Sequence, residues 1–367
     1  MSGEADVELL RRMLEIYSPS GSESELASFL YVELTERGFS KVRLDKVGNV
    51  YGEIGSGSPT LMFCGHMDTV PGRMTVKVEG GRIYGRGAVD AKAPLAAMIS
   101  AASKFLDHLK TGRLILACVV DEEGFGRGIR GLIREGVRAD FALFGEPSGI
   151  CKITFAYKGR VYVRFRLSTP TGHVGAQHIA INAAEKGCQL WWRLRDLSET
   201  YRSKQGIFYS LTPCLIGLRS WRTCGGVPDI CNLDVDVRLP PKIKVNEAIE
   251  ILNNAVDAFK AENKQVSIDI KIKDMVEPFV ADRGSALMKA LREAICEVTG
   301  LNAVFVRKTG TGDMNIYGST LKIPVATYGP GNSSLAHTPV EFIEVEEYLS
   351  SINVYEGVIR RILHRVG

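Results

Sequence analysis

Four short, mostly apolar runs stand out along the chain, at residues 60–64, 113–120, 140–144 and 323–328. Apolar runs of this length without strict alternation are typical of parallel strands that are buried on both faces. Segments with helical spacing separate several of these runs. The pattern therefore predicts an α/β domain in which helices flank a mixed, largely parallel sheet.

Two helices in the first third of the chain carry recognisable end signals. One is predicted to begin with a capping box formed by Ser22 and Glu25 and to end at Gly38. Residues 93–109 predict a second helix, because Pro94 falls in its first turn, where proline is tolerated.

The pattern changes in the middle of the chain, where alternating strands and amphipathic helices follow one another in the order βαββαβ. This order is that of a ferredoxin-like module. The α/β pattern resumes afterwards with an amphipathic helix over residues 284–300. We therefore expect a catalytic domain built from residues 1–157 and 275–367 and an inserted domain over residues 158–274. The predicted elements of the insert are residues 159–168, 181–197, 212–221, 231–239, 245–261 and 267–273.

Composition and charge narrow the class of protein. The chain has 367 residues, is 45% hydrophobic and carries a net charge of +4, which is too small to indicate a nucleic-acid partner. Its apolar runs are far shorter than the ~20 residues of a membrane span, and its first residues lack the apolar core of a secretory signal. We expect a soluble cytoplasmic protein without a membrane partner.

Polar side chains follow each of the predicted buried strands. His66 and Asp68 come after the first, Glu122 and Glu123 after the second, Glu146 after the third, and the fourth leads to His337. Asp90 precedes the second predicted helix. Since the carboxyl ends of strands in an open α/β sheet meet at one crevice, we expect these side chains to converge.

So many carboxylates repel one another unless a cation lies among them. Mixed imidazole and carboxylate ligation fits Zn²⁺, with Co²⁺ or Mn²⁺ as substitutes, and the surplus of carboxylates indicates two ions about 3.5–4 Å apart. Taken singly, a histidine after a strand is more often a core residue, and a pair of glutamates is more often a solvated face. The chain contains no complete GxGxxG, P-loop or GxSxG motif, which argues against nucleotide and serine-hydrolase chemistry.

The motifs GHMDTVP, GRGAVDAKAPLAAM, DEEGFGRG and GEPSG, with the late His337, resemble those of the M20 metallopeptidases and amidohydrolases. That family includes acetylornithine deacetylase, succinyl-diaminopimelate desuccinylase, aminoacylase and carboxypeptidase G. The resemblance implies an amide hydrolase with two zinc ions per subunit, whose inserted domain serves as a lid and in homodimer formation. It implies that Asp68 orients His66 and that Glu122 is the catalytic acid and base. The implied ligands are His66, Asp90 and Glu146 for one zinc and Asp90, Glu123 and His337 for the other.

A narrower resemblance lies near the carboxyl end. Residues 306–318 (VRKTGTGDMNIYG) and 325–338 (VATYGPGNSSLAHT) are similar to hydrolases that release lysine or ornithine from an amino-group carrier protein, in lysine and arginine biosynthesis. In that branch the carrier is acidic. Residues 157–274 hold 18 Lys and Arg against 12 Asp and Glu, and this excess would favour the approach of such a partner, although ordinary surface also accounts for it.

The resemblance also implies substrate contacts. His173 resembles a lid histidine that reaches the active site of the other subunit and stabilises an oxyanion. Arg238 matches an arginine that lies near a substrate carboxylate, and a structural salt bridge is an equal alternative. Gly225 stands where relatives commonly carry asparagine. The segment that would shape the pocket for the product amino acid includes Thr309, Thr311 and Asp313.

Two other functions remain open on the sequence alone. The first is a deacylase of free N-acyl amino acids, such as acetylornithine or acetyllysine, or a dipeptidase. The second is a noncatalytic relative that binds amino acids or metal on the same scaffold. Retention of Glu122 beside a full set of ligands argues against the noncatalytic alternative.

Overall fold

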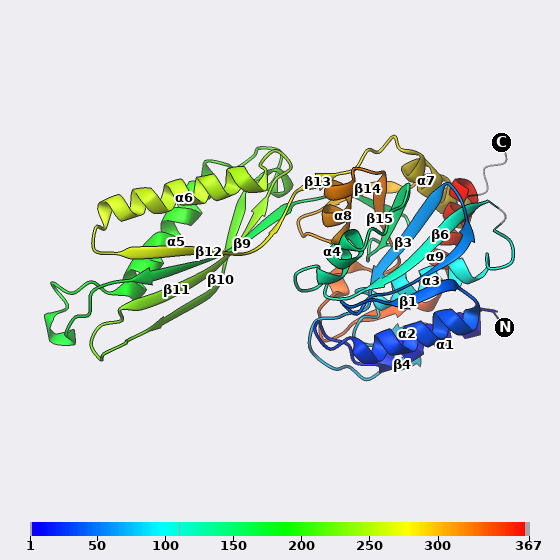
Figure 1. Cartoon of the computed structure of the whole chain (residues 1–367), viewed down its shortest axis with the longest axis horizontal. Coiled ribbons are helices and arrows are strands. Elements are labelled where there is room, and N and C mark those ends of the chain that lie inside the picture. Colours follow the sequence, from blue (N-terminus) through cyan, green and yellow to red (C-terminus); the bar gives the residue numbers. More distant parts are fainter. Residues whose placement is uncertain (1, 110, 364–367) are drawn as a thin grey trace. The chain divides into compact units, whose positions relative to one another are not determined.

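The structure, a computed structural model, describes residues 2–109 and 111–363 and divides into two compact units (Figure 1). The second unit is built almost entirely from one continuous stretch, which interrupts the first unit along the chain. The first unit comprises Met1–Phe155, Ala281–Arg307 and Gly312–Gly367, and the second comprises Ala156–Val280 and Lys308–Thr311.

Most helices and strands lie outside residues 159–276. In chain order they are α1 (Ser2–Glu15), α2 (Ser24–Arg37), β1 (Ser40–Leu44), β2 (Val50–Ser56), β3 (Thr60–His66), β4 (Lys77–Glu79), β5 (Arg82–Tyr84), α3 (Lys92–Ser103), β6 (Gly112–Val119), α4 (Arg127–Arg134), β7 (Phe141–Gly145), β8 (Lys152–Tyr157), β13 (Phe279–Val280), α7 (Ala286–Thr299), β14 (Val304–Lys308), α8 (Asp313–Leu321), β15 (Val325–Tyr328), β16 (Phe342–Glu344) and α9 (Val345–Leu363).

A nine-stranded mixed sheet has all of its strands except β13 mainly in the first unit. Its strand order is β1-β2-β6-β3-β7-β15-β8-β13, and β14 pairs with β8. The four adjacent strands β6, β3, β7 and β15 are parallel. They coincide with the four apolar runs of the sequence, and all seven residues of β3 are buried, as a strand covered on both faces requires. The predicted α/β class with a mixed sheet is confirmed. The flanking pairs β1–β2, β2–β6, β15–β8 and β8–β13 are antiparallel, so the sheet is less parallel than predicted.

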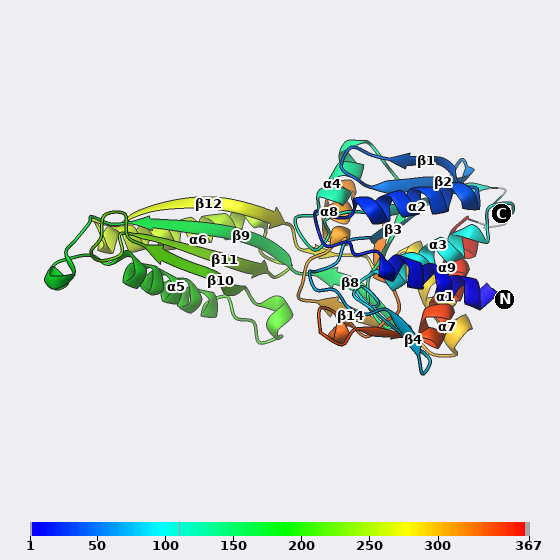
Figure 2. The same cartoon turned by 90° about the horizontal axis from the view of Figure 1, so that it is seen from below.

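Helices cover this sheet and complete its core. Helices α3 and α9 pack against β3 and β6, and α7 packs against α9 (Figure 2). Helix α3 is buried around almost its whole circumference, which explains its alanine-rich sequence. The rings of Phe63 and Tyr328 each lie 5.3 Å from the ring of Tyr355, so aromatic contacts join α9 to two central strands.

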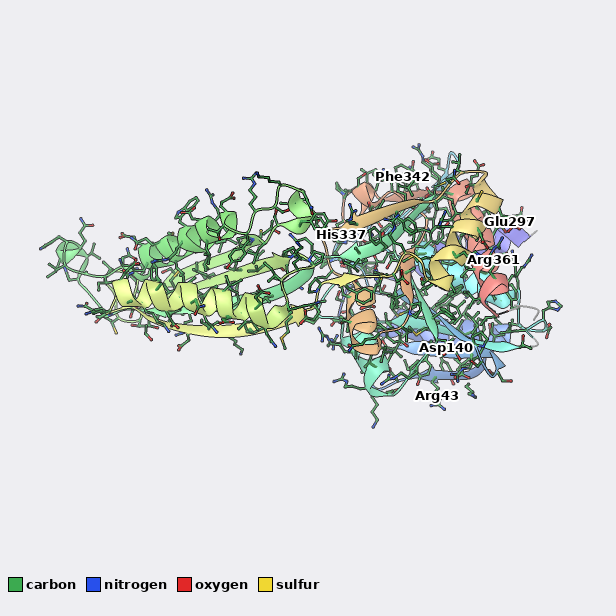
Figure 3. All side chains as sticks on the ribbon, turned by 90° about the horizontal axis from the view of Figure 1, so that it is seen from above. Arg43, Asp140, Glu297, His337, Phe342 and Arg361 are labelled. Carbon is green, nitrogen blue, oxygen red and sulfur yellow. The ribbon has the colours of Figure 1, made fainter. Side chains whose placement is uncertain are left out.

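An ion pair at the surface also joins α9 to α7. Arg361 of α9 pairs with Glu293 and Glu297 of α7, and Figure 3 labels Arg361 beside Glu297. Exposed pairs of this kind contribute only about 0–1 kcal/mol to stability. The attachment of α9 therefore depends mainly on its buried face.

Two predicted helix ends differ from the structure. Helix α2 begins with Glu23 as its N-cap, and no side chain caps it, so the predicted capping box of Ser22 and Glu25 is wrong. Glu23 is instead nearly buried and accepts the backbone N–H of Asp121, a contact distant in sequence. Helix α3 ends at Ser103 rather than at residue 109. The left-handed Gly38 that ends α2 is confirmed.

The second unit is an antiparallel sheet with two helices. Its strand order is β10-β11-β9-β12, and its chain order is βαββαβ, as the sequence pattern predicts. Alternate residues of β9 are buried, namely Val161, Val163, Phe165 and Leu167, and they form a core with α5 and α6. The elements are β9 (Gly159–Ser168), α5 (Ala183–Glu199), β10 (Thr212–Trp221), β11 (Ile230–Leu239), α6 (Val245–Glu262) and β12 (Ser267–Val276).

Within the described part of the chain, none of the helices combines the length and the apolar character that crossing a bilayer requires.

Candidate metal centre

The polar side chains that follow the parallel strands meet at one edge of the sheet. His66 is the last residue of β3, Glu123 follows β6, and Glu146 follows β7. Asp90 lies just before α3, and His337 lies in the loop that follows β15. The parallel direction of the strands explains this convergence, because their carboxyl ends share one edge.

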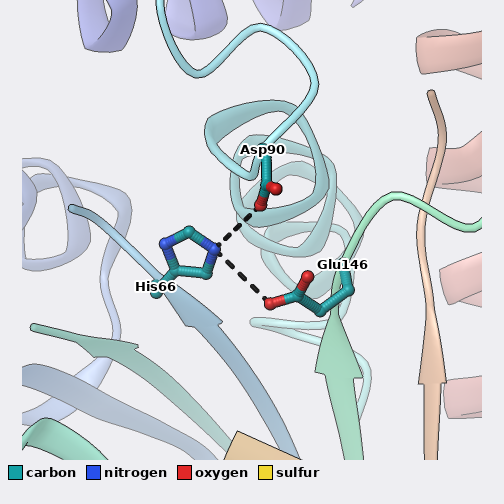
Figure 4. Close-up of side chains that lie close together, drawn as sticks. All are labelled: His66, Asp90 and Glu146. Atoms are coloured by element: carbon teal, nitrogen blue, oxygen red, sulfur yellow. Dashed lines mark hydrogen bonds and ion pairs between the residues drawn. The ribbon is translucent and has the colours of Figure 1, made fainter. Parts of the chain in front are cut away.

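The first group of potential ligands surrounds His66, whose side chain is buried. Its Nε2 lies 3.3 Å from Oδ1 of Asp90 and 3.4 Å from Oε1 of Glu146 (Figure 4). One ligand atom from each of these three residues lies within 4.8 Å of the others, a separation that suits a shared cation.

The second group surrounds His337, which is half exposed. Its Nε2 lies 2.8 Å from Oε1 of Glu123 and 3.4 Å from Oδ2 of Asp90. Asp90 thus belongs to both groups. Its Oδ1 faces His66 of the first group, and its Oδ2 faces His337 of the second. His66, Glu122 and Glu123 form a third set within the same distance limit, so Glu122 lies beside both groups.

The electrostatics of these groups indicate that a cation belongs among them. Burial, together with the charge of Glu146, raises the pKa of Glu122 well above its usual value. Burial opposes the charge of His66, but hydrogen bonds with Asp68, Asp90 and Glu146 outweigh it and raise the pKa of His66. Hydrogen bonds with Asp90 and Glu123 raise the pKa of His337 to about 10. Bound divalent cations would offset the repulsion among these carboxylates, and the imidazole and carboxylate donors fit such ions.

Asp68 connects His66 to the segment that carries the two glutamates. Its side chain is fully buried, and its Oδ1 lies 3.5 Å from Nδ1 of His66. The same Oδ1 accepts the backbone N–H of Glu122 at 3.0 Å, while Oδ2 accepts that of Glu123 at 3.1 Å. The backbone carbonyl of Asp68 lies closer still to Nδ1 of His66, at 2.9 Å. Asp68 therefore fixes the histidine through its carbonyl and its carboxylate, and the carboxylate also fixes the turn after β6.

Sequence reasoning missed the residue that fixes Asp68. Ser20 donates its hydroxyl to Oδ2 of Asp68 at 2.6 Å. Burial raises the pKa of Asp68, but hydrogen bonds from His66, Ser20 and the Glu122 N–H outweigh it, so the pKa is lowered overall. A serine in a glycine-containing loop carries no signal in the sequence that points to this role.

Asp313 also belongs to the first unit, where it begins α8 and is buried. Burial raises its pKa to about 8, and the charge of Glu146 acts in the same direction. The charge of Glu146 therefore acts on Asp313, although Asp313 is not a member of any of the three sets of potential metal ligands.

The other predicted substrate residues belong to the second unit. Arg238 donates Nε to Oδ1 of Asp236 at 2.6 Å and Nη1 to Oγ1 of Thr311 at 3.4 Å. Nδ1 of His173 accepts the backbone N–H of Gly175 at 3.0 Å, which leaves Nε2 of the ring outside this turn. Thr309 is exposed.

Gly225, which the family resemblance sets against an asparagine, adopts a left-handed conformation with φ of 69° in an exposed loop. Most side chains rarely adopt this conformation. Because asparagine also tolerates this conformation and the space around the Cα is open, nothing in the structure explains glycine at this position.

Comparisons with known proteins identify the family. The model of "Peptidase family M20/M25/M40" matches residues 62–361. A LysW-lysine hydrolase of Deinococcus radiodurans is 33% identical over 98% of this chain and 98% of its own length. A LysW-lysine/LysW-ornithine hydrolase of Sulfurisphaera tokodaii is 31% identical over 97% of this chain and 95% of its own.

Solved structures share the fold. The M20 metallo-carboxypeptidase Sso-CP2 of Sulfolobus solfataricus superposes with a TM-score of 0.81 at 20% identity, covering 98% of this chain and 99% of that one. A Bacillus subtilis protein described as a dinuclear metal-binding M20 peptidase superposes with a TM-score of 0.74 at 14% identity, over 100% of this chain and 99% of its own. The extent of the family match and of the relatives' similarity shows that the chain belongs to the M20 peptidase family and is a hydrolase.

Proposed function

We propose that this chain is a two-metal amide hydrolase that releases lysine or ornithine from an acidic amino-group carrier protein. The observation that carries the proposal is the pair of ligand groups that share Asp90, with Glu122 beside them. The full-length similarity to hydrolases named for LysW-lysine and LysW-ornithine supports the class of substrate.

The two ligand groups define which residues would hold each ion. His66, Asp90 and Glu146 would hold one, and Asp90, Glu123 and His337 would hold the other. Zn²⁺ suits this donor set, and Co²⁺ or Mn²⁺ would substitute for it. When bound, such ions polarise the amide carbonyl and make water available as a nucleophile at neutral pH.

Glu122 provides the proton transfers. Its carboxylate lies beside the ligand groups and is partly buried, and its backbone N–H is held by Asp68, so it is close to the reaction and its orientation is restricted. It accepts the proton of the attacking water and delivers it to the leaving amine. A carboxylate serves both steps only if it is not occupied as a metal ligand. The family resemblance assigns Glu123 to the second ion, and the grouping of Glu123 with Asp90 and His337 supports this assignment.

The remaining residues bind substrate in this proposal. His173 of one subunit donates to the developing oxyanion in the active site of the other subunit, and Arg238 pairs with a substrate carboxylate. Thr309, Thr311 and Asp313 shape the pocket for the product amino acid. The second unit acts as lid and homodimer interface, and its basic excess favours the approach of the acidic carrier.

A comparison of substrates tests the proposal. Purified protein loaded with Zn²⁺ is incubated with carrier-lysine, carrier-ornithine, acetyllysine, acetylornithine and a dipeptide, and kcat/KM is measured for each. We expect the carrier adducts to exceed the free acylated amino acids by at least tenfold, with a rate that falls as salt screens the basic surface. Free substrates that outperform the adducts would show a deacylase or dipeptidase instead.

Asp68→Asn is expected to weaken the site without removing a ligand. The amide keeps one acceptor oxygen, which can bond only one of the two backbone N–H groups, those of Glu122 and Glu123, that Asp68 accepts. The other N–H group then faces the amide N–H₂ and loses its acceptor. Loss of such an orienting partner typically costs 10–100-fold in metal affinity or activity, and we expect a fall of that size in kcat/KM. Ser20→Ala, which removes only one bond to Asp68, should cost less; an equal or larger loss would contradict this ranking.

A further inference from the structure

A completely buried glutamate outside the ligand groups holds the loop that presents Asp90. Glu341 precedes β16, and its Oε1 accepts three backbone N–H groups at once. These come from Gly87 at 3.1 Å, Val89 at 2.9 Å and Asp90 itself at 3.0 Å. One oxygen therefore fixes the backbone on which the shared ligand is mounted.

The second oxygen of Glu341 is held by a cation from the same loop. Arg86 donates Nη1 to Oε2 at 2.6 Å, and both side chains are nearly excluded from solvent. Arg86 Nε also donates to the carbonyl of Gly72, at 3.2 Å. The buried carboxylate is thus fully compensated, by one guanidinium and three amides.

The loop adopts a conformation that brings its amides together. Gly87 has a φ of 90°, and a Cβ at this position would approach Cγ2 of Thr69 within 2.9 Å. Glycine is therefore required here both by conformation and by space. In addition, the backbone N–H of Gly85 donates to the backbone carbonyl of Glu341 at 3.2 Å, so the two segments are joined at both ends of the loop.

We propose that Glu341 is a positioning residue that sets the location of Asp90 between the two ligand groups. The inference rests on the proposed function, because it concerns the affinity of the ions that Asp90 would share. Both oxygens of Asp90 face a histidine, at 3.3 and 3.4 Å, so a shift of its backbone misplaces a ligand of both groups at once. Glu341 bonds to Asp90 only through the backbone N–H and takes no part in the chemistry.

Two conservative variants separate positioning from a purely structural ion pair. Glu341→Gln keeps an oxygen at the same reach for the three N–H groups but loses the charge that Arg86 neutralises. Glu341→Asp keeps the charge but is one methylene shorter, which withdraws the oxygen from the N–H groups. If Glu341 positions Asp90, Glu341→Gln preserves the metal site better than Glu341→Asp does. If Glu341 serves only as the ion-pair partner of Arg86, Glu341→Asp preserves the site better.

The readouts are the Zn²⁺ dissociation constant, from competition with a chelator, and the visible absorption spectrum of the Co²⁺-loaded protein. We expect Glu341→Asp to weaken Zn²⁺ binding by about 10–100-fold and to change the Co²⁺ spectrum. Glu341→Gln should stay within a few-fold of wild type and keep its spectrum. Glu356→Gln is the matched control, because Glu356 is a nearly buried glutamate that pairs with Lys104 and Arg360 instead.

Two results would overturn the assignment of Glu341. One is wild-type Zn²⁺ affinity in both variants, and the other is affinity kept by Asp and lost by Gln. The substrate proposal fails separately: a wild type that binds two ions but does not cleave carrier adducts would reject the substrate and leave Glu341 in its role. A wild type that binds no divalent ion would reject both.

Discussion

Glu122→Gln is expected to lower kcat by at least 10³-fold while the protein keeps its metal. The amide has the size of the carboxylate but cannot accept the proton of the attacking water, and general acid and base groups typically contribute about 10²–10⁴-fold to a rate. Because the substitution removes no ligand in our assignment, metal per chain should match wild type. Steady-state kinetics and elemental analysis on the same preparation measure the two quantities.

Glu123→Gln is the matched control, since it makes the same chemical change at the adjacent residue. Glu123 lies 2.8 Å from His337, and we expect its substitution to lower the occupancy of the second ion as well as the rate. Glu122 and Glu123 both lie close enough to His66 to share an ion with it, so this pair of variants decides between them. Unchanged turnover in Glu122→Gln would remove the assigned base.

Asp90→Asn is expected to have the second large effect, because it changes a ligand that belongs to both groups. The amide offers one weak oxygen donor where the carboxylate offers two charged ones. We expect metal content to fall from two ions per chain to less than one, and kcat/KM to fall by more than 10³-fold through loss of metal chemistry. Elemental analysis after dialysis against metal-free buffer measures the first effect.

Asp107→Asn, which changes an exposed aspartate just beyond α3, should leave metal content and rate unchanged. Glu146→Gln should act on only one of the two ligand groups and should therefore retain more metal than Asp90→Asn. If Asp90→Asn retained two ions per chain, Asp90 would not be shared and the arrangement of the centre would have to be revised.

The parts of the fold that the sequence predicts well are those in which one local pattern suffices. The runs that became β3, β6, β7 and β15 are apolar throughout because both faces are covered, and this leaves a clear signal. The positions of His66, Glu146 and the other candidate ligands follow from the same strands. Their roles as ligands still come from the resemblance to the family and stay a proposal.

The parts that could not be predicted depend on contacts between distant segments. Glu341 looks like an ordinary acidic residue, and only its three hydrogen bonds from backbone N–H groups of residues 87–90 reveal its role. Likewise, Ser22 and Glu25 have the local pattern of a capping box, but the structure uses Glu23 instead, which bonds to Asp121. A local sequence pattern does not determine the helix cap when a buried group elsewhere in the chain forms the hydrogen bond instead.

The order of the strands has a consequence for how the protein is made. Strand β15 lies between β7 and β8 in the sheet, yet the ribosome produces it long after both of them. Until then the apolar edges of β7 and β8 have no neighbour, and unpaired edges of this kind promote aggregation during synthesis. The nascent chain must therefore keep a gap in its central sheet until its last strands emerge, and a chaperone that shields this gap would favour its correct closure.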